Sequence, residues 1–268
     1  MTALIGKTAL VTGTSARRGI GRAIAKRLAA DGASVVVADL PGDAVRADLQ
    51  AELVTDLRAM GVKAVSLDLD VTSDQSIQMC IEQARATFGT LDILVNNAGS
   101  LAGSKAFMAT TPSEWEASFK VNILGPMMLA QAVIPQMIAA SGGRIINIGS
   151  TGSLGAEPGF GAYTAMKHGL VGLTKTLAAE FGPHGILCNT VCPGYIATDM
   201  HEAATRRLAD ENGITVEAMR ERRYGAVALR SAGLPEDVAH AVAFLAGPHS
   251  TYITGVNFPV SGGVPCGI

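Results

Sequence analysis

Short apolar runs alternate along this chain with longer segments in which apolar residues recur at helical spacing. The runs read as strands buried on both faces, because they are continuously apolar rather than alternating. This order is typical of repeated βαβ units, whose strands form a parallel sheet and whose helices cover it. We therefore predict an α/β fold with a mainly parallel sheet.

The same pattern places the individual elements. Strands are expected at residues 8–12, 34–38, 63–69, 93–95, 144–148 and 187–191, with a short final strand at 257–260. Helices are expected at residues 22–31, 50–60, 73–88, 112–138 and 235–245, and another carries Tyr163 and Lys167 to about Phe181. Residues 198–230 are helical in pattern, charged and long for a connection, which favours a lid over a ligand site.

Composition narrows the class of protein. Hydrophobic residues make up 48% and charged residues 16% of 268 positions, and the formal charge is −2. Such a chain has little disorder and no electrostatic case for nucleic acid or anionic membrane. No stretch reads as a signal segment or a membrane span, so we expect a cytoplasmic protein.

The four cysteines are Cys80, Cys188, Cys192 and Cys266. They lack CxxC spacing, and Cys188 and Cys192 lie in an apolar run. We expect buried core thiols in a reducing compartment, with no disulfide and no metal site.

A glycine-rich turn follows the first strand. Thr12 to Gly21 reads TGTSARRGIG and leads into a helix, and the next strand ends in Asp39. Glycines let the backbone approach a pyrophosphate, and the helix N-terminus faces the negative charge of that group. An acid at the end of the next strand accepts hydrogen bonds from the ribose hydroxyls. The turn alone could be structural. Asp39 strengthens the dinucleotide hypothesis and favours NAD, because a carboxylate repels the 2′-phosphate of NADP.

Polar residues follow other strands at the edge where parallel sheets bind ligands. Asp70 could bind the adenine amino group or cap the next helix. Asn96 to Gly99 reads NNAG, which is also ordinary turn chemistry. Asn122, inside the helix expected at 112–138 with Ser113 and Glu116 as its capping box, could be a satisfied core amide or a ligand to an ordered water. Ser150 comes directly after the strand 144–148 and Gly149, at the same edge of the sheet.

Tyr163 and Lys167 lie four residues apart, on one face of a helix. A nearby cation favours phenolate, so we expect Lys167 to draw the pKa of Tyr163 down from about 10 toward neutrality. The alternative is a surface tyrosine that happens to precede a lysine.

Taken together, these motifs resemble the classical short-chain dehydrogenase/reductase family over nearly the whole chain. The resemblance rests on TGTSARRGIG, Asp70-Val71, NNAG, Asn122, Ser150, Tyr163 with Lys167, PGYIAT at 193–198, and the late PEDVA and ITG segments. It implies a three-layer, doubly wound Rossmann fold as a single domain over residues 1–268, with a helical substrate lid at about 198–230.

The resemblance also assigns roles. Ser150 would orient the substrate, Tyr163 would be the acid/base, Lys167 would lower the pKa of Tyr163 and bind the nicotinamide ribose, and Asn122 would hold a water in a proton relay. Residues expected at the cofactor are Gly13, Ser15, Arg18, Gly19, Ile20, Gly21, Asp39, Leu40, Asp70, Val71, Asn97, Ala98, Gly99, Tyr163, Lys167, Pro193, Gly194, Ile196 and Thr198. A homotetramer is the family expectation.

The glycine turn departs from the family. Five residues stand between Gly13 and Gly19, where three are usual, and Arg18 occupies a place where NADP-using relatives often carry a basic residue. Asp39 outweighs this cue, because an arginine in an extended loop can point to solvent.

The expected activity is NAD-dependent interconversion of a secondary alcohol and a ketone. An NADP-dependent 3-oxoacyl-thioester reductase is the alternative, and a non-catalytic nucleotide sensor is a minor one. Expected substrate walls are Ser150, Leu154, Phe160, Tyr195 and Met200, together with Leu101. These walls hold no arginine, which disfavours an anionic substrate unless the lid arginines Arg206, Arg207, Arg220, Arg222 and Arg223 reverse that.

Overall fold

The computed structural model describes residues 3–42 and 44–264, and its centre is a sheet of seven strands. All six strand pairs are parallel, in the order β3-β2-β1-β4-β5-β6-β7. The strands are β1 Thr8–Thr12, β2 Ser34–Asp39, β3 Ala64–Asp68, β4 Ile93–Asn96, β5 Gly143–Ile148, β6 Ile186–Pro193 and β7 Asn257–Val260. The strand order reverses direction between β1 and β4, which leaves a crevice at their carboxyl ends.

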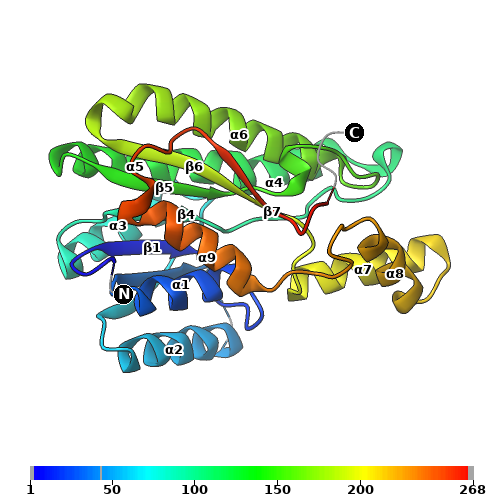
Figure 1. The fold of residues 1–268 in the computed structure, drawn as a ribbon, viewed down its shortest axis with the longest axis horizontal. Helices are drawn as coiled ribbons and strands as arrows, with labels where there is room; N and C mark the ends of the chain where they lie inside the picture. The colour runs from blue at the N-terminus through cyan, green and yellow to red at the C-terminus, as the bar shows by residue number, and fades with distance from the viewer. Residues whose placement is uncertain (1–2, 43, 265–268) are drawn as a thin grey trace.

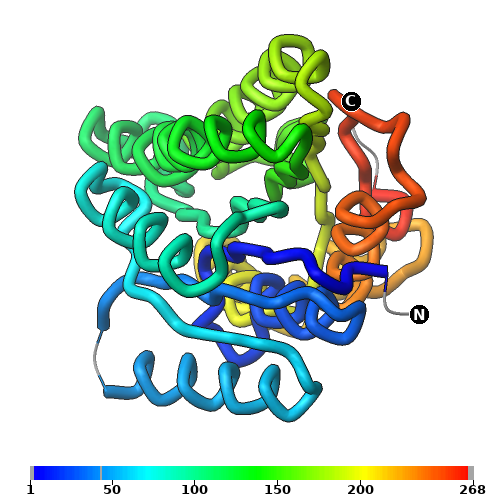
Figure 2. The backbone as a smooth tube through the Cα atoms, turned by 90° about the vertical axis from the view of Figure 1, so that its left-hand side faces the viewer, coloured from blue at the N-terminus to red at the C-terminus, as the bar shows by residue number. Residues whose placement is uncertain are grey.

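Helices cover both faces of the sheet, so the predicted three-layer, doubly wound α/β fold is confirmed (Figures 1 and 2). On one face lie α1 Ile20–Ala30, α2 Ala44–Ala59 and α9 Pro235–Ala246. On the other lie α3 Asp74–Phe88, α4 Pro112–Phe119, α5 Gly125–Ala139 and α6 Gly161–Phe181. Two further helices, α7 Asp199–Asn212 and α8 Val216–Gly225, extend beyond the carboxyl ends of the strands (Figure 1).

Each face of the sheet buries its own apolar cluster. The first joins β1, β2 and β4 to α1, α2 and α9, and the second joins the same sheet to α3, α5 and α6. Strands β1 and β4 are buried at every position, as the continuous apolar runs predicted. Cys80, Cys188 and Cys192 are buried cysteines within these layers, whereas Cys266 lies outside the described residues.

A ladder of polar side chains crosses the otherwise apolar second layer. Asn96 Nδ2 on β4 donates to Asn147 Oδ1 on β5 at 2.8 Å, and Asn147 Nδ2 donates to Thr174 Oγ1 on α6 at 2.8 Å. Thr190 on β6 donates to the same Thr174 hydroxyl at 2.8 Å. All four side chains are buried, so the ladder joins three strands to α6 just below the carboxyl edge of the sheet.

Two helices differ from their predicted bounds. Helix α2 begins at Ala44, whereas the sequence predicted a start at Gln50. The prediction missed the first turns because they are mostly exposed and carry no apolar period. The segment predicted as one helix at 112–138 is broken by a π-helical turn, Lys120–Leu124, between α4 and α5. Its cap is also not the predicted one: Thr111 accepts from the Glu114 amide, and Glu114 completes the capping box.

The same segment corrects the expectation that no stretch could span a membrane. Pro112–Ala139 is long and apolar enough by length and composition, with 44% of its most apolar window buried. Its apolar residues form core contacts with the sheet and α3, since Leu129, Val133 and Met137 are almost fully buried. Core helices of this kind pass the same test of length and composition.

Candidate active site

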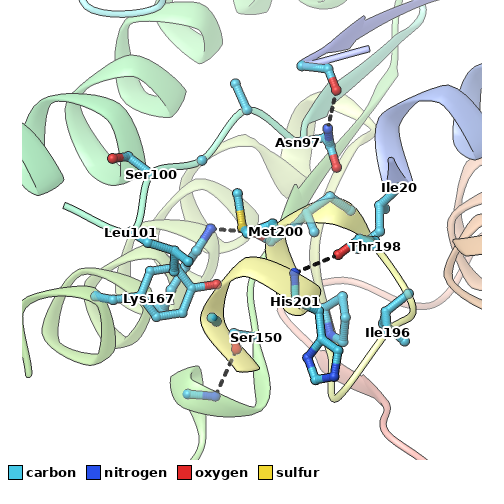
Figure 3. Close-up of a pocket in the computed structure, with 18 of the residues that line it drawn as sticks. Ile20, Asn97, Ser100, Leu101, Ser150, Lys167, Ile196, Thr198, Met200 and His201 are labelled. Carbon is cyan, nitrogen blue, oxygen red and sulfur yellow. Dashed lines mark hydrogen bonds between the residues drawn. The ribbon is translucent and has the colours of Figure 1, made fainter. Parts of the chain in front are cut away.

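A large cavity opens at the carboxyl edge of the sheet, with a volume of about 1190 Å³. It runs from the glycine-rich turn after β1, past the ends of β4 and β5, to the lid helices α7 and α8. Ser150, Lys167, Thr198, Met200 and His201 surround its central part (Figure 3). The lid predicted at about 198–230 therefore forms one wall of this cavity.

The glycine turn is tied to the end of β4. Asn97 Nδ2 donates to the carbonyls of Thr12 and Gly13 at 2.8 and 3.0 Å, and the Thr12 hydroxyl accepts from the amides of Asn97 and Ala98. Gly13 has φ +72°, and a Cβ at Gly21 would collide with the Gly13 carbonyl and the Asn97 amide. These two positions therefore require glycine.

The first turn of α1 faces the cavity. Gly19 is its N-cap and supplies no side-chain bond to the orphan amides, and Ser15, Arg18, Gly19 and Ile20 line the cavity. Asp39, at the end of β2, accepts from the Ser15 amide at 2.8 Å and also lines the cavity. An open helix N-terminus beside a carboxylate fits the pyrophosphate and ribose of a dinucleotide.

The arginines around this end are paired with carboxylates. Arg46 contacts Asp39 at 3.3 Å, and both Arg17 and Arg22 contact Glu52 at 2.8 Å. The sequence suggested that Arg18 can point to solvent. Instead, Nη2 of Arg18 lies 2.8 Å from Oδ1 of Asp199, the first residue of α7. The lengthened glycine turn therefore contacts the lid across the cavity.

Ser150, Tyr163 and Lys167 meet at the carboxyl end of β5. Ser150 follows that strand, and Tyr163 and Lys167 lie on one face of α6, as predicted. The Lys167 ammonium donates to the Ile148 carbonyl at 2.8 Å and lies 5.6 Å from the centre of the Tyr163 ring. All three residues line the cavity, so an acid/base group, a hydrogen-bonding hydroxyl and a cation share one volume.

The expected fall in the pKa of Tyr163 does not occur in this structure. Burial raises the pKa of Tyr163 above its ordinary value, and its hydrogen bond with the Ser150 side chain acts against that rise. Burial also lowers the pKa of Lys167 to about 8. Desolvation is therefore the largest influence on the pKa of both groups.

Asn122 lies in the π-helical turn and is fully buried. Its Nδ2 donates to the carbonyls of Ser100 and Ser118, each at 3.0 Å, and its Oδ1 accepts from the Ser100 amide at 3.2 Å. Asn122 does not line the cavity. The amide is therefore satisfied within the protein and holds the loop after β4 in place, while a role for Asn122 in binding an ordered water stays a prediction.

Asp70 does not cap α3. Its Oδ1 accepts from the amide and the hydroxyl of Thr72, at 2.8 and 2.7 Å, whereas Ser73 is the N-cap. Asp70 and the adjacent Val71 line the cavity. This leaves Asp70 available to a ligand at the adenosine end.

The remaining predicted cofactor residues line the cavity with one exception, Gly21. Gly13, Leu40, Asn97, Ala98, Gly99, Pro193, Gly194, Ile196 and Thr198 are on its wall. Gly21 instead packs behind the turn, and Leu154 does not reach the wall where a substrate contact was expected. Leu101, Phe160, Tyr195 and Met200 do line the cavity.

Several lining residues were not singled out from the sequence. Among them are Arg46, Glu157 and His201. Arg46 contacts Asp39, Glu157 lies near Arg223, and His201 contacts Tyr224, and such contacts leave no signal in local spacing. Two of the lid arginines, Arg222 and Arg223, also line the cavity. Within the described residues, no group of three His, Cys, Asp or Glu side chains could hold a metal ion.

A family model described as enoyl-(acyl carrier protein) reductase matches residues 13–265. The chain belongs to the short-chain dehydrogenase/reductase family. A curated member, the 3-oxoacyl-[acyl-carrier-protein] reductase FabG of Escherichia coli (strain K12), is 40% identical over 97% of this chain and 97% of its own. Membership makes this dehydrogenase/reductase an NAD(P)-dependent oxidoreductase.

Solved structures of family members superpose closely on this one. NAD⁺-bound xylitol dehydrogenase matches with a TM-score of 0.91 and 29% identity, over 97% of this chain and 99% of that chain. A variant of actinorhodin polyketide ketoreductase with NADPH matches with a TM-score of 0.90 and 32% identity, over 96% and 97%. Family members with either nicotinamide cofactor therefore share this fold.

Proposed function

We propose that this short-chain dehydrogenase/reductase uses NAD to interconvert a secondary alcohol and a ketone. The observation that carries the proposal is one continuous cavity, which joins the open N-terminus of α1 and Asp39 to Ser150, Tyr163 and Lys167. Bound NAD would supply the hydride acceptor at nicotinamide C4.

The side chains at the sheet edge would handle the proton. Tyr163, as phenolate, accepts the hydroxyl proton of the alcohol, and Ser150 hydrogen-bonds the substrate oxygen as its charge changes. The Lys167 cation favours the phenolate and contacts the nicotinamide ribose. Asn122, by fixing Ser100 and the π-helical turn, keeps the backbone at Gly99 in place beside Lys167.

NAD is preferred over NADP because of the charges at the adenosine end. Asp39 lies where the adenosine ribose is expected, and a 2′-phosphate next to its carboxylate would be repelled. Arg46 is engaged by Asp39, and Arg18 by Asp199. A phosphate would have to compete with these carboxylates for either guanidinium.

A screen for reduction of NAD and NADP over a panel of secondary alcohols tests this function. We expect turnover with NAD for at least one alcohol, loss of turnover in Tyr163→Phe, and unchanged NAD binding in that variant. Near-normal turnover by Tyr163→Phe would show that the mechanism is wrong.

An NADP-dependent 3-oxoacyl-thioester reductase is the second candidate. The relative at 40% identity, whose name describes a 3-oxoacyl-[acyl-carrier-protein] reductase, favours it. A higher kcat/KM for NADPH with a 3-oxoacyl thioester than for NAD with any alcohol would select this candidate.

A homotetramer remains the family-based expectation for the assembly, and a cytoplasmic location remains the expectation from the sequence. Large apolar side chains stay exposed on the single chain, among them Phe107, Met108, Phe119 and Tyr252. Light scattering on the purified protein measures the number of copies directly.

A further inference from the structure

Arg223 places a buried positive charge in the wall of the cavity. It lies on α8 of the lid, its side chain is only 7% exposed, and it lines the cavity that holds Ser150 and Tyr163. A guanidinium removed from water is strongly destabilising unless an anion compensates its charge.

The contacts of Arg223 within the protein do not compensate its charge. Nη1 donates to the hydroxyl of buried Thr205 at 2.6 Å, and the guanidinium lies over the Tyr195 ring at 4.4 Å. Both partners are neutral. Nε is buried and has no hydrogen-bond partner among residues 3–42 and 44–264. The donors of Arg223 are therefore held in place but only partly used.

Among the described residues, Glu157 is the acid that forms an ion pair with this guanidinium, and the pair is a long one. Its Oε1 lies 3.8 Å from Nη2 of Arg223, longer than a hydrogen bond, and its side chain is 38% exposed. Burial raises the pKa of Glu157, against the influence of Arg223 and Arg207. The carboxylate can move toward solvent, because it belongs to the loop before α6 and has no hydrogen bond to another residue of the described part of the chain.

Other charges around this end of the cavity do not supply an anion. Glu202 is paired with Arg206 and Arg220, and Arg207 is paired with Glu211. His201 has its pKa lowered to about 4, chiefly by burial and then by Arg223, and so is neutral. Arg222 adds a second cation at the exposed part of the same wall.

We propose that the substrate of this site carries a carboxylate, which binds Arg223 in the place that Glu157 approaches in the free protein. A carboxylate matches the charge of this buried, undercompensated cation and the planar fork of its guanidinium. The inference rests on the proposed function: Arg223 would fix the acid end of a hydroxy or oxo acid while Ser150 and Tyr163 meet its carbinol carbon. It also reverses the expectation that the pocket lacks an arginine for an anionic substrate.

Calorimetric titration of the NAD complex tests the inference without turnover. The probes are straight-chain monocarboxylates from propanoate to octanoate and their matching primary amides. In the unaltered protein we expect at least one carboxylate to bind about tenfold or more tightly than its amide, because charged hydrogen bonds exceed neutral ones. Arg223→Gln should bring that ratio close to one.

Two further variants sharpen the result. Arg206→Gln removes an exposed arginine on α7 that does not line the cavity, and it should leave the ratio unchanged. Glu157→Gln removes the competing acid from a half-buried loop position with a side chain of nearly the same shape, and it should tighten carboxylate binding severalfold. This second change keeps the test decisive if Arg223→Gln fails to fold.

Three outcomes overturn the inference: no carboxylate preference in the unaltered protein, a preference that persists in Arg223→Gln, or unchanged or weaker carboxylate binding in Glu157→Gln. Failure of the proposed function looks different. In that case no alcohol is oxidised and Tyr163→Phe changes nothing, whereas the preference for carboxylates over amides is measured independently of both.

Discussion

The ammonium of Lys167 donates a 2.8 Å hydrogen bond to the carbonyl oxygen of Ile148, the last residue of β5. This bond holds the buried lysine beside the Tyr163 ring while leaving the phenol to Ser150. The carbonyl at the end of β5 therefore fixes the position of the ammonium group, while α6 carries the lysine itself.

Replacing Lys167 by Met should abolish most of the activity. The variant loses the cation that favours the Tyr163 phenolate, and we expect turnover to fall at least about 100-fold, the scale of lost acid/base catalysis. Steady-state kinetics with NAD and the best alcohol of the panel measures it. Lys175→Met, on an exposed position of the same helix, is the control and should keep normal turnover.

Replacing Ser150 by Ala should move the pH profile of alcohol oxidation to higher pH. The hydrogen bond with Ser150 lowers the pKa of Tyr163 against the effect of burial, so its loss raises that pKa further. Oxidation needs the phenolate, so its alkaline rise must occur later in the variant. A rise at the same or lower pH in kcat/KM profiles contradicts the assigned hydrogen bond.

Replacing Asp39 by Ser should weaken the preference for NAD. The change removes the carboxylate that repels a 2′-phosphate and that now contacts Arg46. We expect the ratio of kcat/KM for NAD to that for NADP to fall about tenfold or more, since a carboxylate next to a phosphate is worth upwards of about 1.4 kcal/mol. An unchanged ratio would place the adenosine ribose elsewhere.

Replacing Asn147 by Ala should destabilise the fold. The change leaves buried Asn96 Nδ2 without its acceptor, removes one of the hydrogen bonds of Thr174 and opens a space between β5 and α6. We expect the free energy of unfolding to drop by about 2–4 kcal/mol in urea titrations. Thr176→Ala, exposed on α6, should change it by less than about 0.5 kcal/mol.

Replacing His201 by Gln should make the free energy of unfolding less dependent on pH between 6.5 and 4. Burial depresses the pKa of His201 from 6.5 to about 4, so the unfolded state binds a proton that the folded state does not between these values. The free energy of unfolding of the unaltered protein should therefore fall by up to about 3 kcal/mol as the pH falls from 6.5 to 4. Above pH 6.5 this contribution is fully present. Urea titrations at several pH values compare the two proteins. If the free energy of unfolding depends on pH in the same way in both proteins, the lowered pKa of His201 is contradicted.

Much of the fold follows from local patterns. The bounds of β1 and β7 agree with prediction. For β1 the reason is that continuous apolar residues before a polar turn define a buried strand without help from neighbours. The start of α2 was missed, since its exposed first turns carry no apolar period. The π-helical turn was missed because Asn122 bonds to Ser100 and Ser118 only once α4 and the loop after β4 are in contact.

By itself, the sequence determined the parallel sheet, the glycine turn, Asp39 and the Ser150, Tyr163 and Lys167 set, because each depends on residue type and short spacing. Tertiary structure decided the rest. It placed Lys167 on the Ile148 carbonyl, Arg18 on Asp199, and buried Arg223 in the cavity wall. These contacts join segments far apart in the chain, and burial then changes the pKa values and the charge balance that residue types alone suggest.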